Sequence, residues 1–239
     1  MERWSRIFRE WYGKPLPLDY LVFDMETTGL KRDWHLPVDI GHTIVRGGKV
    51  VHQGSFLLNW TGYPGVDRER IVQDLAKVEK AMTAQGKAFH YPIERLEEEG
   101  KDPFDVLTFY YQLFTKNRRA GAKFVGHNAW FFDAVMFRSI CEETTDLVWE
   151  FRPNELFDTG AMTKAVIGNF EPYPDEKTLK QYFLRVKNAY AKGVKWSIEA
   201  CIERYDLVNK FGLKPEQLHG AGNDSYVAHL LFEEYRIEV

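Results

Sequence analysis

The chain has 239 residues, of which 44% are hydrophobic and 15% aromatic, and its formal net charge is −3. This composition excludes an intrinsically disordered chain, because disorder requires few apolar residues and a high net charge. A pI near 6.2 also excludes a strongly basic nucleic-acid coat protein, whose pI would exceed about 9. It does not exclude a nucleic-acid enzyme, which can combine an acidic metal site with a local basic surface.

The cysteines and the first residues of the chain indicate in which cellular compartment we expect the protein. The two cysteines, Cys141 and Cys201, form no Cys-x-x-Cys motif, so we predict two buried thiols and no zinc site; one bridge between them is the alternative. The first ten residues are charged and lack the apolar core of a signal peptide. No run approaches the ~18 apolar residues that span a bilayer. We therefore expect a soluble, cytoplasmic protein without a membrane segment.

The first part of the chain predicts a helix followed by a meander of strands. Apolar residues at helical spacing within 4–11 indicate an N-terminal helical extension over residues 1–16. The apolar run 20–23 predicts a buried strand that ends at Asp24. Two further strand patterns, at 38–45 and 49–58, flank a Gly-Gly pair that is typical of a hairpin.

The rest of the chain alternates between helical and strand patterns. Residues 60–102 form a helical insertion with periodic segments at 68–82 and 92–100, and Asp102 opens a third helix. A meander followed by alternating strands and helices predicts an α/β fold, in which a mixed sheet is flanked by helices. We predict a single domain over residues 1–239. Later strands are expected at 123–126 and 156–159, and later helices directly after Asn128 and at 161–166, 197–205 and 224–235.

The segment Asp24-Met-Glu26 carries the strongest chemical signal. Carboxylates two residues apart on a strand point to the same face of the sheet. Two neighbouring carboxylates repel each other unless a cation lies between them, and hard divalent metals prefer such oxygen ligands. An exposed edge strand with unrelated acids is the alternative. The preceding apolar run favours a central strand instead.

Two later segments carry further acids. Asp133 follows a predicted strand and is expected one to two turns into the next helix, where a surface acid is the alternative. His219 and Asp224 lie five residues apart across a glycine-rich turn that opens a helix. They could share one site; alternatively, Asp224 is an N-cap and His219 a loop residue.

The three segments, in this order, resemble the DEDDh branch of the DnaQ-like 3′→5′ exonucleases, in the ribonuclease H-like superfamily. The likeness rests on Asp-x-Glu-Thr-Thr-Gly-Leu at 24–30, on Gly-His-Asn-Ala with a later Asp at 126–133, and on His-x-Ala-x-x-Asp at 219–224. It covers residues 18–60 and 104–237, but not the segments 60–102 and 168–196. The second motif has its Asp six residues after the His, where many members have five. The resemblance implies a ribonuclease H-like mixed five-stranded sheet with helices on both faces.

The resemblance also implies a two-metal mechanism for hydrolysing phosphodiester bonds. Asp24 would bridge two Mg²⁺ or Mn²⁺ ions, with Glu26 and Asp224 completing one metal site and Asp133 the other. His219 would be the general base that takes a proton from the attacking water, because the ordinary pKa of histidine lies near 6.5. Such an enzyme releases 5′-nucleoside monophosphates from the 3′ end of DNA or RNA.

Substrate contacts are expected next to the metal ligands. By resemblance, Thr27, Thr28 and Leu30 hold the terminal nucleotide. Asn128 either contacts the substrate or caps a helix. Asp158 is interpreted as a supporting residue rather than a ligand.

The basic and aromatic segment 168–196 is the candidate for contact with the nucleic-acid backbone. Cations interleaved with aromatic rings suit single-stranded nucleic acid. The alternative is a helix with a solvated basic face and a buried aromatic face. The residues concerned are Lys177, Lys180, Arg185, Lys187, Lys192 and Lys195, with Tyr182, Phe183, Tyr190 and Trp196.

These patterns predict a metal-dependent 3′→5′ exonuclease whose partner is single-stranded or 3′-ended nucleic acid. Two alternatives stay open. One is a catalytically inactive or partner-dependent nucleic-acid-binding module with the same fold, and the other is the proofreading subunit of a polymerase. The sequence gives no support for a polymerase or homodimer partner and does not separate DNA from RNA. It also leaves open whether the 60–102 insertion is a lid, an oligomer contact or extra packing.

Overall fold

The computed structural model describes residues 16–31, 34–213 and 219–236. The helix predicted within residues 4–11 lies outside these ranges. Among the described residues, no helix is long and apolar enough to cross a bilayer. Both cysteines are buried free thiols, as predicted.

A mixed sheet of five strands forms the centre of the molecule, with the strand order β3-β2-β1-β4-β5. The first three strands are antiparallel neighbours, whereas β4 and β5 run parallel to β1. The turn between β2 and β3 contains Gly47 and Gly48, both with positive φ, as a tight hairpin requires. The predicted fold class is therefore confirmed. The strands are β1 (Tyr20–Thr27), β2 (Pro37–Arg46), β3 (Lys49–Leu57), β4 (Lys123–Gly126) and β5 (Leu156–Asp158).

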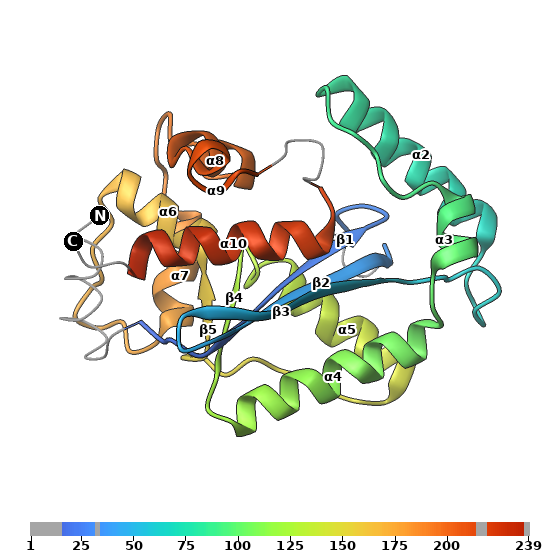
Figure 1. Ribbon diagram of the computed structural model, residues 1–239, viewed down its shortest axis with the longest axis horizontal. Helices are drawn as coiled ribbons and strands as arrows, with labels where there is room; N and C mark the ends of the chain where they lie inside the picture. The colour runs from blue at the N-terminus through green and yellow to red at the C-terminus, as the bar shows by residue number, and fades with distance from the viewer. Residues whose placement is uncertain (1–15, 32–33, 214–218, 237–239) are drawn as a thin grey trace.

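Helices cover both faces of this sheet (Figure 1). On one face, α10 crosses β2, β1 and β4 and is joined by α6 and α8. On the other face, α4 packs on β1 and against α5. The helices of these two layers are α4 (Pro103–Arg119), α5 (Asp133–Thr145), α6 (Thr159–Gly168), α8 (Ile198–Arg204) and α10 (Ala221–Arg236).

Side chains along β1 alternate between the two layers. Phe23 packs against Phe114 of α4 at 5.3 Å between ring centroids. Tyr20 meets Phe232 of α10 at 4.9 Å. Because the strand repeats every two residues, Asp24 and Glu26 share the face of Tyr20 and point toward α10.

Within the described part of the chain, four helices lie outside these two layers. The insertion holds α2 and α3, beyond the end of the sheet near the start of α10 (Figure 1). It returns to the sheet through a bridge between Leu58 and Lys101. The segment 168–196 contains α7, which packs on α6. The bounds are α2 (Arg68–Ala84), α3 (Ile93–Glu99), α7 (Leu179–Asn188) and α9 (Leu207–Phe211).

Candidate active site

Three of the predicted acids converge where β1 meets α10. Oxygen atoms of Asp24, Glu26 and Asp224 lie within 4.8 Å of one another. The approach of α10 depends on Gly41, which pairs with Asp24 in the β-sheet register. A Cβ at Gly41 would lie 2.0 Å from the carbonyl carbon of Ala221, so only glycine lets the helix start so close to the sheet.

Asp133 reaches the same place from the start of α5, the helix that follows β4. The pairing of β4 with β1 ends at Val22, which leaves the following edge of β1 open. The Oδ1 atom of Asp133 accepts a hydrogen bond of 3.0 Å from the backbone N–H of Met25 on that edge. This bond occupies one carboxyl oxygen and leaves the other for a ligand beside Asp24.

The position of Asp133 in its helix corrects the sequence-based expectation. Asp133 is the first residue of α5 and does not lie one to two turns into it. The preceding residues form a turn, in which Asn128 has a left-handed φ of 65°. Asp158 holds this turn by accepting hydrogen bonds from the backbone N–H groups of Asn128 (2.9 Å) and Trp130 (3.2 Å). The turn therefore accommodates the longer spacing of the second motif and delays the start of the helix.

Asn128 does not cap a helix, so that alternative was wrong. The N-cap position of α5 is occupied by Phe132. The side-chain oxygen of Asn128 instead accepts a hydrogen bond from the ammonium of Lys187 on α7. His127 beside it joins two further segments, with its Nε2 2.9 Å from the carbonyl oxygen of Trp196 and its Nδ1 3.0 Å from the Thr159 hydroxyl. A carbonyl can only accept, so the Nε2 of His127 carries a proton.

The gathered carboxyl groups repel one another in the absence of a cation. Burial, and then the charge of Asp133, raise the pKa of Asp24 well above its usual range. Burial and the charge of Asp224 do the same to the pKa of Glu26. Burial is also the main cause that raises the pKa values of Asp133 and Asp224 to about 7. A divalent cation would favour the ionised forms and lower all four pKa values, so the oxygen donors fit a hard metal ion.

The backbone of His219 lies beside this cluster, in the turn that precedes α10, but His219 is not among the described residues that line the cavity next to the acids. Its backbone N–H donates a hydrogen bond of 3.2 Å to Oδ1 of Asp224. The imidazole is half-buried, and burial followed by the cation of Lys87 lowers its pKa, while the charge of Glu199 acts in the opposite direction. Lys87, from the insertion, and Glu199, on α8, form an ion pair.

An open cavity of about 530 Å³ adjoins the acids. It brings together four of the predicted site residues, Asp24, Glu26, Asp133 and Asp224, with Asn128 of the predicted substrate contacts. The remaining lining residues come from β1, from the turn before α5 and from the segment before α8; they are Met25, His127, Phe132, Val194, Lys195, Trp196, Ser197 and Ile198.

The other predicted substrate contacts lie away from this lining. The described residues around the cavity do not include Thr27, Thr28 or Leu30. Thr28 is buried, and its hydroxyl accepts a hydrogen bond from the backbone N–H of Leu36, which closes the loop after β1. Leu30 is 83% exposed. Thr27 donates its hydroxyl to the carbonyl of Gly29 at 2.7 Å.

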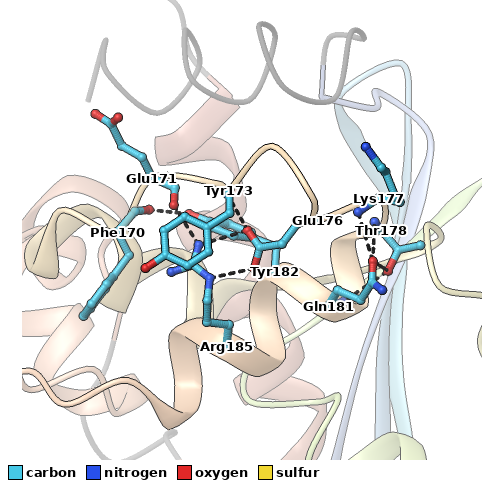
Figure 2. A network of polar contacts seen from close by, with 9 residues as sticks. All are labelled: Phe170, Glu171, Tyr173, Glu176, Lys177, Thr178, Gln181, Tyr182 and Arg185. Carbon is cyan, nitrogen blue, oxygen red and sulfur yellow. Dashed lines mark hydrogen bonds and ion pairs between the residues drawn. The ribbon is translucent and has the colours of Figure 1, made fainter.

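The basic segment divides into a structural part and an accessible part. Arg185 donates two hydrogen bonds to the carboxylate of Glu176 (2.6 and 3.0 Å) and one to the carbonyl of Glu171, and its guanidinium lies 3.8 Å from the centre of the Tyr173 ring (Figure 2). Tyr182 and Phe183 are buried. For these residues the alternative interpretation, a helix with a buried aromatic face, is correct. In contrast, Lys192 and Lys195 are exposed.

Several residues at the site carry no recognisable sequence signal. Lys87 and Tyr91 belong to the insertion, which matches no motif. Glu199 lies in a helix whose pattern indicates only an amphipathic surface. Their proximity to the acids results from contacts between segments more than 100 residues apart, as in the Lys87–Glu199 pair, and short-range periodicity does not report such contacts.

Comparison with known proteins supports the fold. No protein-family model matches the chain, and no curated protein does. The zinc-bound complex of E. coli exonuclease I with single-stranded DNA is similar, with a TM-score of 0.56 and 16% identity over 91% of this chain and 39% of that chain. The complex of E. coli exonuclease I with a dT13 oligonucleotide gives a TM-score of 0.58 and 15% identity over 90% and 40%. The chain spans only about two fifths of the length of these structures. The chain therefore has the fold that these exonuclease I structures share with it.

Proposed function

We propose that the chain is a metal-dependent 3′→5′ exonuclease of the DEDDh type. The observation that carries this proposal is the convergence of Asp24, Glu26 and Asp224 within 4.8 Å, with Asp133 beside Asp24 at an open cavity. Clustered carboxylates of this kind are costly to a fold unless they hold a cation. The order of the motifs and the likeness to exonuclease I support the reaction type.

The four carboxylates would hold two Mg²⁺ or Mn²⁺ ions, in agreement with the preference of these ions for a few carboxylates and several waters. Bound there, the ions supply an activated water and stabilise charge on the phosphoryl oxygens. Two carboxyl groups each have one oxygen engaged by a backbone N–H, from Met25 to Asp133 and from His219 to Asp224. These bonds fix the direction of the second oxygen, which is the one available to a ligand.

His219 acts as the general base in this proposal. Burial and the nearby Lys87 lower its pKa below the ordinary value of 6.5. The imidazole is therefore neutral at pH 7 and can accept a proton from the attacking water. Replacing it with alanine should lower turnover by ~10²–10⁴-fold and leave metal binding intact, since the backbone N–H that contacts Asp224 stays in place.

The substrate proposed is single-stranded or 3′-ended nucleic acid. The structures of exonuclease I that the chain resembles include complexes with single-stranded DNA. In this chain Trp196 and Lys195 line the cavity together with Asn128. An aromatic ring beside a cation suits a stacked base and its phosphate. Thr27, Thr28 and Leu30 stay proposed contacts of the terminal nucleotide, through a part of the loop outside the cavity lining.

The deciding experiment follows degradation of matched single-stranded DNA and RNA, labelled at the 3′ or the 5′ end. Reactions contain Mg²⁺, Mn²⁺ or a chelator, and the Asp24→Asn variant is run in parallel. We expect a metal-dependent ladder that shortens from the 3′ end and is absent in the variant. The result also separates DNA from RNA. No cleavage of either polymer by folded protein would favour the binding module or a proofreading subunit that needs its polymerase.

A further inference from the structure

The turn that carries His219 has an unusual backbone conformation. His219 has a φ of 68°, in the left-handed region that side chains other than glycine seldom adopt. Such conformations persist where surrounding contacts enforce them. The direction of the imidazole therefore depends on whatever holds this turn.

Contacts on both sides of His219 hold the turn. Its N–H donates to Asp224, as described above, and its carbonyl oxygen lies 3.3 Å from the hydroxyl of Tyr91. The same hydroxyl lies 3.1 Å from Oδ2 of Asp39. That carboxylate oxygen also accepts a hydrogen bond of 3.2 Å from the N–H of Ala221, the first residue of α10.

These contacts join three parts of the chain at one point. Tyr91 comes from the link between α2 and α3 in the insertion, and Asp39 comes from β2, opposite Glu26 in the sheet register. Both residues are 4% exposed, so these hydrogen bonds are largely shielded from solvent. The hydroxyl proton of Tyr91 is shared between the carboxylate of Asp39 and the carbonyl of His219, so one buried oxygen atom holds both groups in place.

We propose that Tyr91 and Asp39 are positioning residues for His219, and that the 60–102 insertion serves this purpose. The inference rests on the proposed function, because it assigns how the general base is aimed. Tyr91 fixes the carbonyl side of the histidine, and Asp39 fixes the residue that starts α10. Without them the turn can relax out of the left-handed conformation and move the imidazole away from the attacking water.

The test is a double-mutant cycle on the full-length chain, with a 3′-labelled single-stranded oligonucleotide and Mg²⁺. Tyr91→Phe removes only the hydroxyl and should lower kcat about tenfold, the effect of one lost hydrogen bond, with KM within about twofold. In a His219→Ala background the same change should have almost no effect, because no imidazole remains to be aimed. Asp39→Asn keeps an acceptor for the N–H of Ala221 and should have a smaller effect than Asp39→Ala.

Tyr63→Phe is the matched control, because Tyr63 also lies in the insertion and its hydroxyl also contacts a carbonyl, that of Thr144 at 3.3 Å. This variant should leave kcat unchanged. An equal loss from Tyr91→Phe in both backgrounds, or no loss in the wild-type background, would overturn the inference while the exonuclease assignment stands.

Histidine-selective NMR gives a readout that needs no catalysis. The ring and amide signals of His219 should shift in Tyr91→Phe and stay in place in Tyr63→Phe. Unchanged His219 signals in Tyr91→Phe would refute the positioning role even if the protein cleaves no substrate. Shifted signals in a protein without nuclease activity would retain that role and refute the proposed function instead.

Discussion

Replacing Asp224 with asparagine should stabilise the metal-free protein and abolish its activity. The buried carboxyl has its pKa raised from 3.8 to about 7 in the folded chain. Because the folded pKa exceeds the unfolded one, ionisation destabilises the fold. The penalty is absent below about pH 3.8 and complete above about pH 7. Asparagine does not ionise, and its amide oxygen can still accept the hydrogen bond from His219.

The size of the effect follows from the same pKa values. The interval between 3.8 and about 7 corresponds to roughly 4 kcal/mol at pH 8. For a chain of this size 1 kcal/mol shifts Tm by about 2–4 °C. Water reaches the open cavity and reduces the cost of burying the ionised carboxylate, so we expect a rise in Tm of roughly 8 °C at most. At pH 5 the penalty has accumulated only over the interval from 3.8 to 5. The difference in Tm between the variant and the wild type should therefore be less than half of its value at pH 8.

Thermal unfolding followed by circular dichroism, in chelator at pH 8 and at pH 5, measures both values. Glu142→Gln on the exposed side of α5 is the control, since it removes one negative charge far from the cluster. It should change stability by no more than about 0.5 kcal/mol at either pH. If Asp224→Asn is no more stable than the wild type at pH 8, or keeps the same advantage at pH 5, the buried charge of Asp224 does not destabilise the fold and the argument is wrong.

Three further outcomes are expected. Mn²⁺ at about 100 times its Kd should stabilise the wild type by about 2.7 kcal/mol in thermal unfolding at pH 8, and Asp24→Asn should lose most of this gain; equal stabilisation would place the ion elsewhere. In urea unfolding, Gly41→Ala should destabilise the protein by at least about 1–3 kcal/mol, and it should abolish cleavage, because the added Cβ meets the start of α10. The control Gly54→Ala on β3, where an added Cβ has its closest contact at 3.7 Å, should fold and cleave normally. Neutralising Lys192 and Lys195 together should flatten the salt dependence of oligonucleotide binding by about two phosphate contacts, and an unchanged slope would remove this segment from the binding surface.

The central sheet and the acids of β1 were accessible from the sequence because their signals are local. The apolar run before Asp24 marks a buried strand, and the two-residue spacing of the acids sets their common face. The Gly-Gly pair gives the hairpin. Each of these three signals lies within about ten residues, so it can be recognised in the sequence without information on distant contacts.

The failures arose where a distant contact decided the local structure. The helix after β4 starts late because Asp158, thirty residues further along, captures the N–H groups of the preceding turn. Arg185 is an exception, because its partners Glu176 and Glu171 lie in the same 168–196 segment; there the pattern of cations did not show which of them are paired with acids. Tyr91 contacts the carbonyl of His219, 128 residues away. The periodicity of the sequence does not predict such long-range partners.

The same long-range contacts explain how the chain keeps four repelling carboxylates in place. Each acid is positioned by contacts outside the cluster. Asp24 and Glu26 lie on the central strand β1, and Asp133 is bonded to the open edge of that strand. Asp224 lies on α10, which can approach the sheet because residue 41 is glycine. We therefore expect the cluster to assemble without a metal ion, which would relieve the repulsion within it once bound. The scaffold should accordingly stay folded in chelator. Its stability should fall as the pH rises from 3.8, the ordinary pKa of aspartate, to about 7, the pKa of Asp133 and Asp224 in the folded chain. A chain that used the ion to fold would instead unfold in chelator at every pH.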